Sequence, residues 1–350
     1  MAKQRNNSIN IKSVAQLAGV SISTVSRVIN SPESVSEELR ERVRKAIEEL
    51  GYRPNQIARS LRTGSTKVVG FIIPDITNPA FLLMVKGAED YLKRKGYMFI
   101  VCGTDHNIEE ETKLLKTLLS QSVEGIIVTC SGGRNSSFAK TIQDSGVKLV
   151  FMDRRYEDID LPYVGVDNTA GMEKITDLLV QTGHRSFVYL SGERNTSSAK
   201  ERLRGFMKSM KKHGVKDYQV LYGRFTFESG YELTKKLKKI PEAVLGGNDL
   251  VALGAIEALN EMGYHVPDDV SVVGFDDMFY SKYSKPGLTT VRQPIYEMGY
   301  IAGKVLWQLL SGKNVRKRVT ILQTDIVLRE TVKERNASDR RLTEKVEVVS

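Results

Sequence analysis

Cysteines and long apolar runs are both scarce in this 350-residue sequence. The only cysteines are Cys102 and Cys130, so a disulfide framework is not expected, and a reducing, cytoplasmic setting fits. Each cysteine stands at the end of a short apolar run, 99–101 or 126–128, which predicts a buried strand and a buried free thiol. No apolar run approaches the roughly 18–20 residues of a membrane span, so no membrane partner is expected. The basic start is not followed by an apolar stretch, which argues against a signal peptide.

Recognisable enzyme motifs are also absent from the sequence. No Gly-rich phosphate loop follows a predicted strand, and there is neither a His-x-x-x-His pair nor a serine elbow motif. The four histidines occur at helix ends or in turn-like contexts. We therefore expect no enzymatic activity, no metal site and no cofactor.

Positive charge is unevenly distributed along the chain. The sequence has 52 Lys and Arg against 42 Asp and Glu, which gives a formal net charge of +10. Residues 1–67 hold twelve basic and six acidic residues, so most of the excess lies in the first fifth of the chain. A basic segment favours an anionic partner, with nucleic acid ahead of an acidic membrane surface.

The pattern of secondary structure changes after a short polar linker at 62–66. Before the linker the sequence is helical in pattern, whereas after it strands and helices alternate. Such alternation predicts parallel, doubly wound sheets, and because the series starts twice we expect two lobes with a cleft between them. Ligands of such sheets bind at the carboxyl ends of the strands. The first series has strands at 68–74, 98–103, 125–130 and 148–153 and helices at 80–95 and 109–121, and the second has strands at 187–191, 220–222, 243–246 and 271–274 and helices at 168–182, 199–213, 229–238 and 249–263.

Residues 11–30 predict a helix-turn-helix. Gly19 supplies the positive φ angle that a tight turn needs, and Ser21 is a suitable N-cap for the second helix. No acidic residue lies between Gly19 and Ser31, and a surface that faces phosphates requires this. The alternative, an ordinary helical hairpin, would tolerate acidic residues here. Such a helix can lie in the major groove and reach base edges. The expected inward residues are Val14, Leu17 and Ala18 in the first helix and Val25, Val28 and Ile29 in the second, and the outward ones are Ile22, Ser23, Ser26 and Arg27.

Two further helical segments follow in the basic region. A helix at 37–50, capped by Ser36, is expected to close a small core over the first two helices. After a break at 51–55, residues 56–61 are compatible with about two helical turns. Because an isolated helix this short is marginal in water, we expect it to order only when it docks on a second copy and in the DNA minor groove.

Several segments together resemble the lactose/galactose/purine repressor family of bacterial transcription regulators. In the first part of the chain they are SVAQLAGVSISTVSRVIN at 13–30 and GYRPNQIARSL at 51–61. Later they include GFIIPDITNPAF at 70–81, RLRGF at 202–206, NDLVALG at 248–254, VGFDD at 273–277 and LTTVRQP at 288–294. The resemblance, which covers residues 9–332, implies a small all-α helix-turn-helix headpiece joined to a two-lobed α/β body of the type I periplasmic-binding-protein-like fold.

The resemblance implies DNA contacts for eleven residues. Ile22, Ser23 and Arg27 match positions that read bases in the major groove. Leu61 matches the residue that two paired hinge helices insert into the central minor-groove step. Two-fold symmetry then implies a homodimer on a near-palindromic, double-stranded operator. The implied DNA-binding residues are Ser21, Ile22, Ser23, Thr24, Ser26, Arg27, Asn30, Tyr52, Asn55, Ala58 and Leu61.

The resemblance also implies an effector site in the body. Carboxylate, amide and guanidinium groups can each form two hydrogen bonds to sugar hydroxyls, and aromatic rings can pack against the faces of a sugar ring. Each such residue taken singly has an alternative role as a salt bridge, a helix cap or core packing. Arg154 stands where some relatives carry an aromatic residue, which favours a sugar over a flat purine. The implied effector-binding residues are Phe81, Asp153, Arg202, Phe225, Asn248, Asp276 and Gln293.

The expected domains follow from these segments. A headpiece at 1–55 precedes a hinge helix and linker at 56–66, a body at 67–332 and a charged tail at 333–350. The tail has no leucine heptad, so a tetramerising coiled coil is not expected. Within the body, the amino-terminal lobe comprises 67–165 and 295–322, and the carboxy-terminal lobe comprises 166–294 and 323–332.

These expectations describe a sequence-specific transcription regulator. We expect a repressor of carbohydrate-utilisation genes whose operator affinity is set by a sugar or related small molecule bound between the lobes. A solute-binding protein of a transporter would share the two-lobed body, but it has no use for residues 11–61. A regulator controlled by a partner protein instead of a small molecule stays open as the second alternative.

Overall fold

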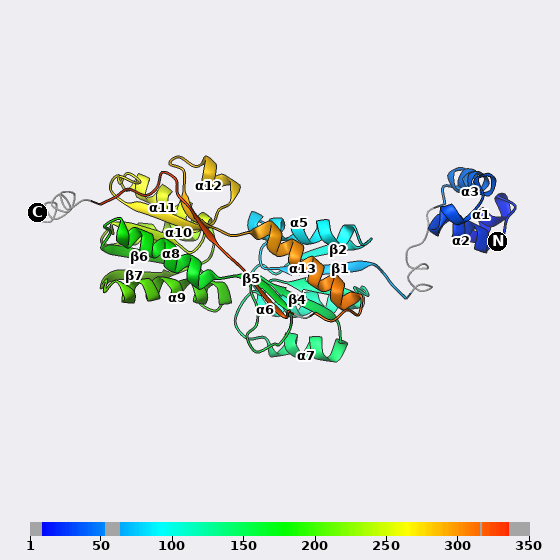
Figure 1. The fold of residues 1–350 in the computed structure, drawn as a ribbon, viewed down its shortest axis with the longest axis horizontal. Coiled ribbons are helices and arrows are strands. Elements are labelled where there is room, and N and C mark those ends of the chain that lie inside the picture. The colour runs from blue at the N-terminus through cyan, green and yellow to red at the C-terminus, as the bar shows by residue number, and fades with distance from the viewer. Residues whose placement is uncertain (1–8, 53–63, 316, 336–350) are drawn as a thin grey trace, which may run out of the picture. The chain divides into compact units, whose positions relative to one another are not determined.

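The chain divides into two compact units, residues 1–66 and 67–350 (Figure 1). The structure is a computed structural model, and it describes residues 9–52, 64–315 and 317–335. In this described part, no helix is both long and apolar enough to cross a membrane. The two units, called the headpiece and the body below, are considered separately.

The headpiece consists of short helices around a small apolar core. Its helices are α1 (Ile11–Leu17), α2 (Ile22–Asn30) and α3 (Glu37–Leu50), with a 3-10 turn at Pro32–Ser34. Two expectations for these helices are wrong. Leu17 is 46% exposed because Val14, Ala15 and Ala18 already fill the core side of α1, and Ser36 precedes α3 without a capping hydrogen bond from its side chain. The core residues are Val14, Ala15, Ala18, Val25, Val28, Val43 and Ala46.

The amino-terminal lobe of the body is a doubly wound sheet. Its strand order is β11-β5-β4-β3-β1-β2, and all of its pairings are parallel. Helices α5 and α13 pack on one face, and α6 and α7 pack on the other. The strands are β1 (Val68–Ile73), β2 (Met98–Gly103), β3 (Gly125–Val128), β4 (Lys148–Met152), β5 (Tyr163–Val166) and β11 (Val319–Leu322), and the helices are α5 (Pro79–Lys93), α6 (Ile108–Ser120), α7 (Ser136–Ser145) and α13 (Ile295–Leu310).

The carboxy-terminal lobe repeats this plan. Its strand order is β12-β10-β9-β8-β6-β7, in which only the β10–β12 pairing is antiparallel. Helices α8 and α9 cover one face, and α10 and α11 cover the other. The strands are β6 (Ser186–Ser191), β7 (Asp217–Tyr222), β8 (Ala243–Gly246), β9 (Ser271–Asp276), β10 (Thr289–Arg292) and β12 (Asp325–Val327), and the helices are α8 (Asn168–Gln181), α9 (Ser197–Lys212), α10 (Phe227–Lys235), α11 (Asp249–Glu261) and α12 (Phe279–Tyr283).

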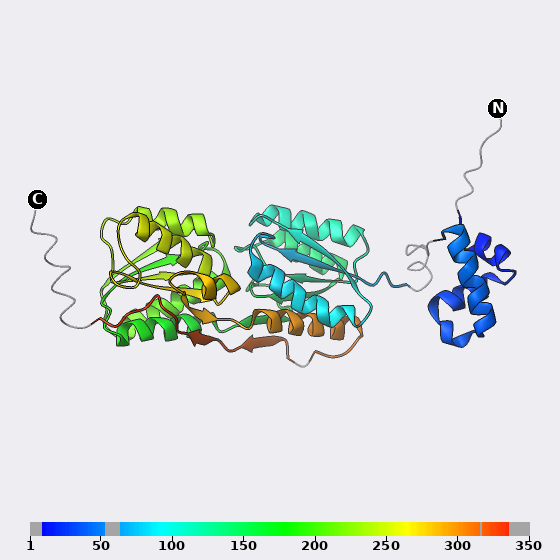
Figure 2. The same ribbon diagram turned by 90° about the horizontal axis from the view of Figure 1, so that it is seen from above.

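The chain crosses between the lobes between β5 and α8, between β10 and α13, and between β11 and β12 (Figures 1 and 2). Helix α13 thus returns to the amino-terminal lobe and lies against α5, far from it in the sequence (Figure 1). Because β8, β9 and β10 are parallel to one another and β4 is parallel to its neighbours, the loops after these strands meet where the lobes face each other.

The prediction that residues 99–101 form a buried strand is wrong. They belong to β2, which pairs only with β1 and is therefore an edge of the sheet. Ile100 and Val101 are 36% and 40% exposed. Cys102 is accordingly only half-buried, whereas Cys130 is buried as expected, and both are free thiols.

Candidate functional site

The second helix of the headpiece presents the surface predicted to read DNA. Ser21 caps α2, since its Oγ accepts a hydrogen bond of 3.1 Å from the backbone N–H of Thr24. Val25 and Val28 face the core, whereas Ile22, Ser23 and Arg27 are exposed. Since α2 carries no acidic residue, nothing on this helix repels a phosphate backbone.

The turn between α1 and α2 is fixed by α3. Gly19 has a φ angle of +60°, which favours glycine. Arg42 of α3 donates from Nη2 to the carbonyl oxygens of Ala18 and Gly19 at 2.7 and 3.3 Å. The bonded turn holds the two helices at a defined angle, which a helix-turn-helix needs to place its second helix in a groove.

Seven more residues are predicted to contact DNA, and of these Thr24 and Ser26 lie half-buried on α2. Asn30 donates from Nδ2 to the carbonyl oxygen of Ser26 at 2.6 Å, so its amide is turned back on its own helix. Tyr52 follows α3 and packs against the headpiece core. Asn55, Ala58 and Leu61 lie outside the described residues.

All seven predicted effector residues line one cavity between the two lobes of the body. Phe81 and Asp153 come from the amino-terminal lobe, whereas the others come from the carboxy-terminal lobe or its connection to α13. Asn78, Ala80, Met84, Arg154 and Ser198 line it as well, and sequence reasoning did not assign them to the site. The cavity has a volume of about 20 Å³, which is room for about one water molecule.

The two aspartates of the cavity have unusual backbone conformations. The φ angles of Asp153 and Asp276 are +62° and +128°, a region that residues other than glycine rarely adopt. Such strain is often retained at binding sites, where it places a side chain that relaxed geometry would not. Burial raises the pKa of Asp153, against the opposing effect of the Arg154 guanidinium, and it raises the pKa of Asp276 to about 6 against that of Arg202.

Arg202 is the most strongly held charged group of the site. Its Nε donates to Oδ1 of Asn168 at 2.8 Å, and its Nη1 donates to the carbonyl oxygen of Gly247 at 2.7 Å. The guanidinium carbon lies 3.9 Å from the ring centroid of Phe275, close enough for a cation–π contact. These contacts fix the plane of the guanidinium before any ligand arrives.

The amide side chains of Asn248 and Gln293 use some of their donors and acceptors in hydrogen bonds within the protein. Asn248 caps α11 by accepting from the N–H of Val251 at 3.0 Å and donates to the carbonyl oxygen of Phe225 at 3.2 Å. Gln293 donates from Nε2 to Oδ1 of Asp276 at 2.6 Å, while its Oε1 is buried and has no partner among the described residues. An unpaired buried acceptor is a position at which a ligand hydroxyl can donate.

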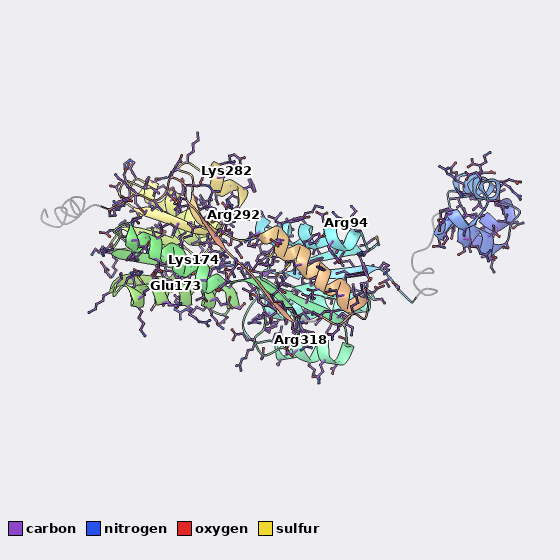
Figure 3. The ribbon with its side chains drawn as sticks, viewed as in Figure 1. Arg94, Glu173, Lys174, Lys282, Arg292 and Arg318 are labelled. Carbon is purple, nitrogen blue, oxygen red and sulfur yellow. The ribbon has the colours of Figure 1, made fainter. Side chains whose placement is uncertain are left out.

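Two arginines hold the loop that follows Asp276 by hydrogen bonds to the next residue, Asp277. Asp277 accepts a hydrogen bond of 2.6 Å from Nε of Arg292, which ends β10 (Figure 3). Its other carboxylate oxygen accepts from Nη2 of Arg329 at 2.5 Å. Asp277 therefore pairs with Arg292 and Arg329, whereas Asp276 faces the cavity.

Arg154 fills the space between the two predicted aromatic platforms. Its guanidinium carbon lies 5.4 Å from the ring centroid of Phe81 and 5.2 Å from that of Phe225, in the opposite lobe. The sequence offered a signal for Arg154, since it directly follows Asp153 at the end of a predicted strand. The sequence did not reveal that its side chain points between the rings.

A second, larger hollow adjoins this cavity. It has a volume of about 730 Å³ and lies between α5, α12 and the start of α13. Leu82, Leu83, Phe279 and Tyr296 line it and are exposed, which gives it an apolar surface. Asp276 and Gln293 line both hollows. We call the larger one the apolar groove.

Comparisons with known proteins identify the family of the chain. The family model "Bacterial regulatory proteins, lacI family" matches residues 10–55, and "Periplasmic binding protein-like domain" matches residues 176–332. The transcriptional regulator RegA of Clostridium saccharobutylicum is 39% identical, over 92% of this chain and 98% of its own. The HTH-type transcriptional repressor PurR of Pasteurella multocida is 34% identical, over 93% of this chain and 99% of its own.

Solved structures show the same architecture over nearly the whole chain. The lac repressor dimer bound to operator and the anti-inducer ONPF matches with a TM-score of 0.83 at 28% identity, over 92% of this chain and 98% of the other. The complex of the regulator CelR with cellobiose matches with a TM-score of 0.71 at 30% identity, over 92% and 99%. The chain therefore belongs to the LacI family of bacterial DNA-binding transcriptional regulators.

Proposed function

We propose that this protein is an operator-specific repressor of carbohydrate-utilisation genes, and that a sugar or related small molecule bound between its lobes controls its DNA affinity. The observation that carries the proposal is the convergence of all seven predicted effector residues, from both lobes, on one cavity. A molecule held by both lobes binds the closed arrangement better than an open one, and only such a difference in affinity can shift an equilibrium between two states.

The exposed face of α2 supports operator recognition. Arg27 carries the bidentate donors that suit guanine, whereas Ile22 and Ser23 suit apolar and hydroxyl contacts with base edges. Ser21, Thr24, Ser26 and Asn30 lie on the same helix or its cap, as phosphate-contacting residues would. Contacts by Tyr52, Asn55 and Ala58, and the wedge role of Leu61, rest on the family resemblance.

The effector proposal draws on the chemistry of the cavity and on the relatives. Two carboxylates, two amides and the Arg202 guanidinium can bond several hydroxyls, and Phe81 and Phe225 can cover the faces of a ring. A relative from Halalkalibacterium halodurans that is 34% identical is named ribose operon repressor, and the CelR structure contains cellobiose. Both names favour a carbohydrate.

We further propose that the apolar groove and the neighbouring edge strand β2 bind a second copy of the chain. Leu82, Phe279 and Val101 are 45%, 67% and 40% exposed, an unusual display of large apolar side chains. The lac repressor structure matched above is a dimer. A two-fold dimer would present two headpieces to a near-palindromic site.

Selection from a pool of random duplex DNA tests the DNA part of the proposal. Full-length protein should enrich a single near-palindromic sequence, which it should bind more than 1,000-fold more tightly than shuffled DNA at matched salt. Recovery of no consensus sequence would overturn operator recognition. Recovery of one half-site without its inverted copy would overturn the dimer.

Control by a partner protein is the competing form of regulation. Calorimetry on the full-length protein separates the two, since a sugar or sugar derivative should release heat and increase or decrease operator affinity. Heat from a phosphocarrier protein, combined with none from small carbohydrates, would replace the small effector by a protein partner.

A further inference from the structure

The charge and hydrogen bonding of Arg154 restrict the chemistry of the effector. Arg154 is only 3% exposed, and its guanidinium lies inside the cavity between the rings of Phe81 and Phe225. A guanidinium group stays protonated in proteins, so this position always carries a positive charge.

The hydrogen-bond donors of this guanidinium are not fully used. Nε and Nη1 are buried, and neither has a hydrogen-bond partner among the described residues. The nearest acid, Asp153, has its Oδ2 3.6 Å from Nε, which is too far for a hydrogen bond. A buried donor without an acceptor is unfavourable, so this site favours a ligand that supplies one.

Among the described residues, the two arginines of the cavity differ in their hydrogen bonds. Arg202 already has Asn168, Gly247 and the carboxylate of Asp276, whose Oδ1 lies 3.6 Å from Nη1. Asp276 in turn accepts from Gln293. Arg154 lies equally far from its aspartate, Asp153, but among the described residues its Nε and Nη1 have no hydrogen-bond acceptor.

The ends of helices at the cavity wall also favour an anion. Three helices of 13–16 residues begin at its wall, with Asn78 preceding α5, Ser198 in the first turn of α9 and Asn248 preceding α11. The amino-terminal end of a helix carries a partial positive charge, which favours an anion. The helix dipoles and the two unused donors of the Arg154 guanidinium therefore favour the same kind of ligand.

We propose that the effector is a polyhydroxylated acid, a sugar-sized molecule whose carboxylate or phosphate pairs with Arg154 while its hydroxyls bond Asp153, Asp276 and Gln293. The proposal rests on the proposed function, because it narrows the ligand of the same cavity. The present volume of about 20 Å³ cannot hold a sugar, so the guanidinium must leave the space between the rings. The sugar ring then replaces it there, and the acid group supplies the missing acceptor.

Calorimetry with matched pairs of ligands tests this proposal on the full-length protein. The acids are glucuronate, galacturonate, gluconate, glucose 6-phosphate and ribose 5-phosphate, and each is compared with the neutral sugar of the same skeleton. At least one acid should bind, at least tenfold more tightly than its neutral counterpart. The uronates and the phosphates separate the two sources of the oxyanion, and inorganic phosphate should bind more weakly than the acid that binds best.

A pair of neighbouring arginines provides the matched variants. Arg154→Gln removes the charge from the cavity, and we expect about a 100-fold loss of affinity for the acid, because a buried charge partner is lost. Arg155→Gln removes the same charge one residue later, where the side chain lines a different, polar pocket, and we expect less than a threefold loss. Both variants should retain operator affinity, which shows that they are folded.

The outcomes distinguish this proposal from the proposed function. Binding of a neutral sugar as tightly as its acid, or acid binding that survives Arg154→Gln, would overturn the acid and leave the sugar-controlled repressor in place. Gain of neutral-sugar binding by Arg154→Gln, with no acid bound by the natural chain, would overturn it also. Absence of heat from every compound would overturn both.

Discussion

The Nη1 atom of Arg202 lies 3.6 Å from Oδ1 of Asp276, and both side chains are buried at the wall of the cavity. The two residues come from helix α9 and the end of strand β9, and β7, α10, β8 and α11 lie between them along the chain. Gln293, from the connection to α13, bonds to the same aspartate oxygen. A ligand that bonds to this cluster therefore contacts both the carboxy-terminal lobe and a connection between the lobes.

Arg202→Ala should abolish the response of operator affinity to the effector and leave operator affinity in the absence of effector within about threefold. The variant removes a preorganised donor from the cavity, whereas the headpiece belongs to the other compact unit. Fluorescence anisotropy with the selected operator, with and without the effector, measures both quantities. The control is Arg204→Ala, an exposed position on the same helix, which should respond as the natural chain does. A retained response in Arg202→Ala would remove this residue from the site.

Arg27→Ala should weaken operator binding about 10- to 100-fold, because one bidentate base contact contributes about 1–3 kcal/mol of discrimination. Its effect on shuffled DNA should be much smaller. Lys45→Ala removes the same charge from an exposed position on α3 and should weaken both kinds of DNA to a similar, small extent. Anisotropy at matched salt measures all four affinities. Equal losses on operator and shuffled DNA in Arg27→Ala would show that Arg27 contacts only phosphates.

Asp249 should make stability depend on pH. Its carboxyl is buried and accepts from the Met278 N–H and the Ser281 hydroxyl, and burial, followed by the nearby Asp276 carboxylate, raises its pKa to about 7. The folded chain therefore keeps a proton between about pH 4 and pH 7 that the unfolded chain has released. The contribution of this group to the free energy of unfolding therefore falls as the pH rises through that range, and it is constant above the range.

Asp249→Asn removes this pH dependence. The free energy of unfolding of the natural chain, relative to that of the variant, should therefore be higher at pH 5 than at pH 8. Urea titration at the two pH values measures it. Asp144→Asn, an exposed position on α7, should show a much smaller change between the two pH values. An Asp249→Asn difference that is independent of pH would contradict the protonated carboxyl.

Gly299→Ala should destabilise the body by about 1–3 kcal/mol, because an added methyl group in a close-packed contact forces neighbours apart. A Cβ at this position would lie 1.9 Å from the carbonyl oxygen of Met84 on α5. Urea unfolding measures the loss, with Gly287→Ala as the control, where the nearest atom to a Cβ is 3.5 Å away. Equal effects of the two substitutions would mean that α13 and α5 separate easily.

Much of the site was predictable because parallel sheets bring the ends of their strands together. Asp153, Asn248 and Asp276 each stand at or just after the end of a strand, and this position suffices to place them near one another. The direction of the Arg154 side chain was not predictable, since it depends on Phe81 and Phe225 approaching from opposite lobes.

The errors in the predicted fold have related physical causes. Ile100 and Val101 are exposed because β2 lies at the edge of its sheet. An apolar run does not indicate where its strand lies in the order of the sheet. Leu17 has the spacing of a core residue, yet α1 has only seven residues and its small core is already filled. In both places, tertiary arrangement decides burial where local pattern does not.

Asp276 and Gln293 line both the effector cavity and the apolar groove. If a second copy occupies that groove, association of the two chains and uptake of the effector are linked equilibria, and linkage is reciprocal. The apparent effector affinity would then vary with protein concentration over the range in which monomers and dimers coexist. In the cell, the abundance of the repressor would help to set the metabolite level at which its genes respond.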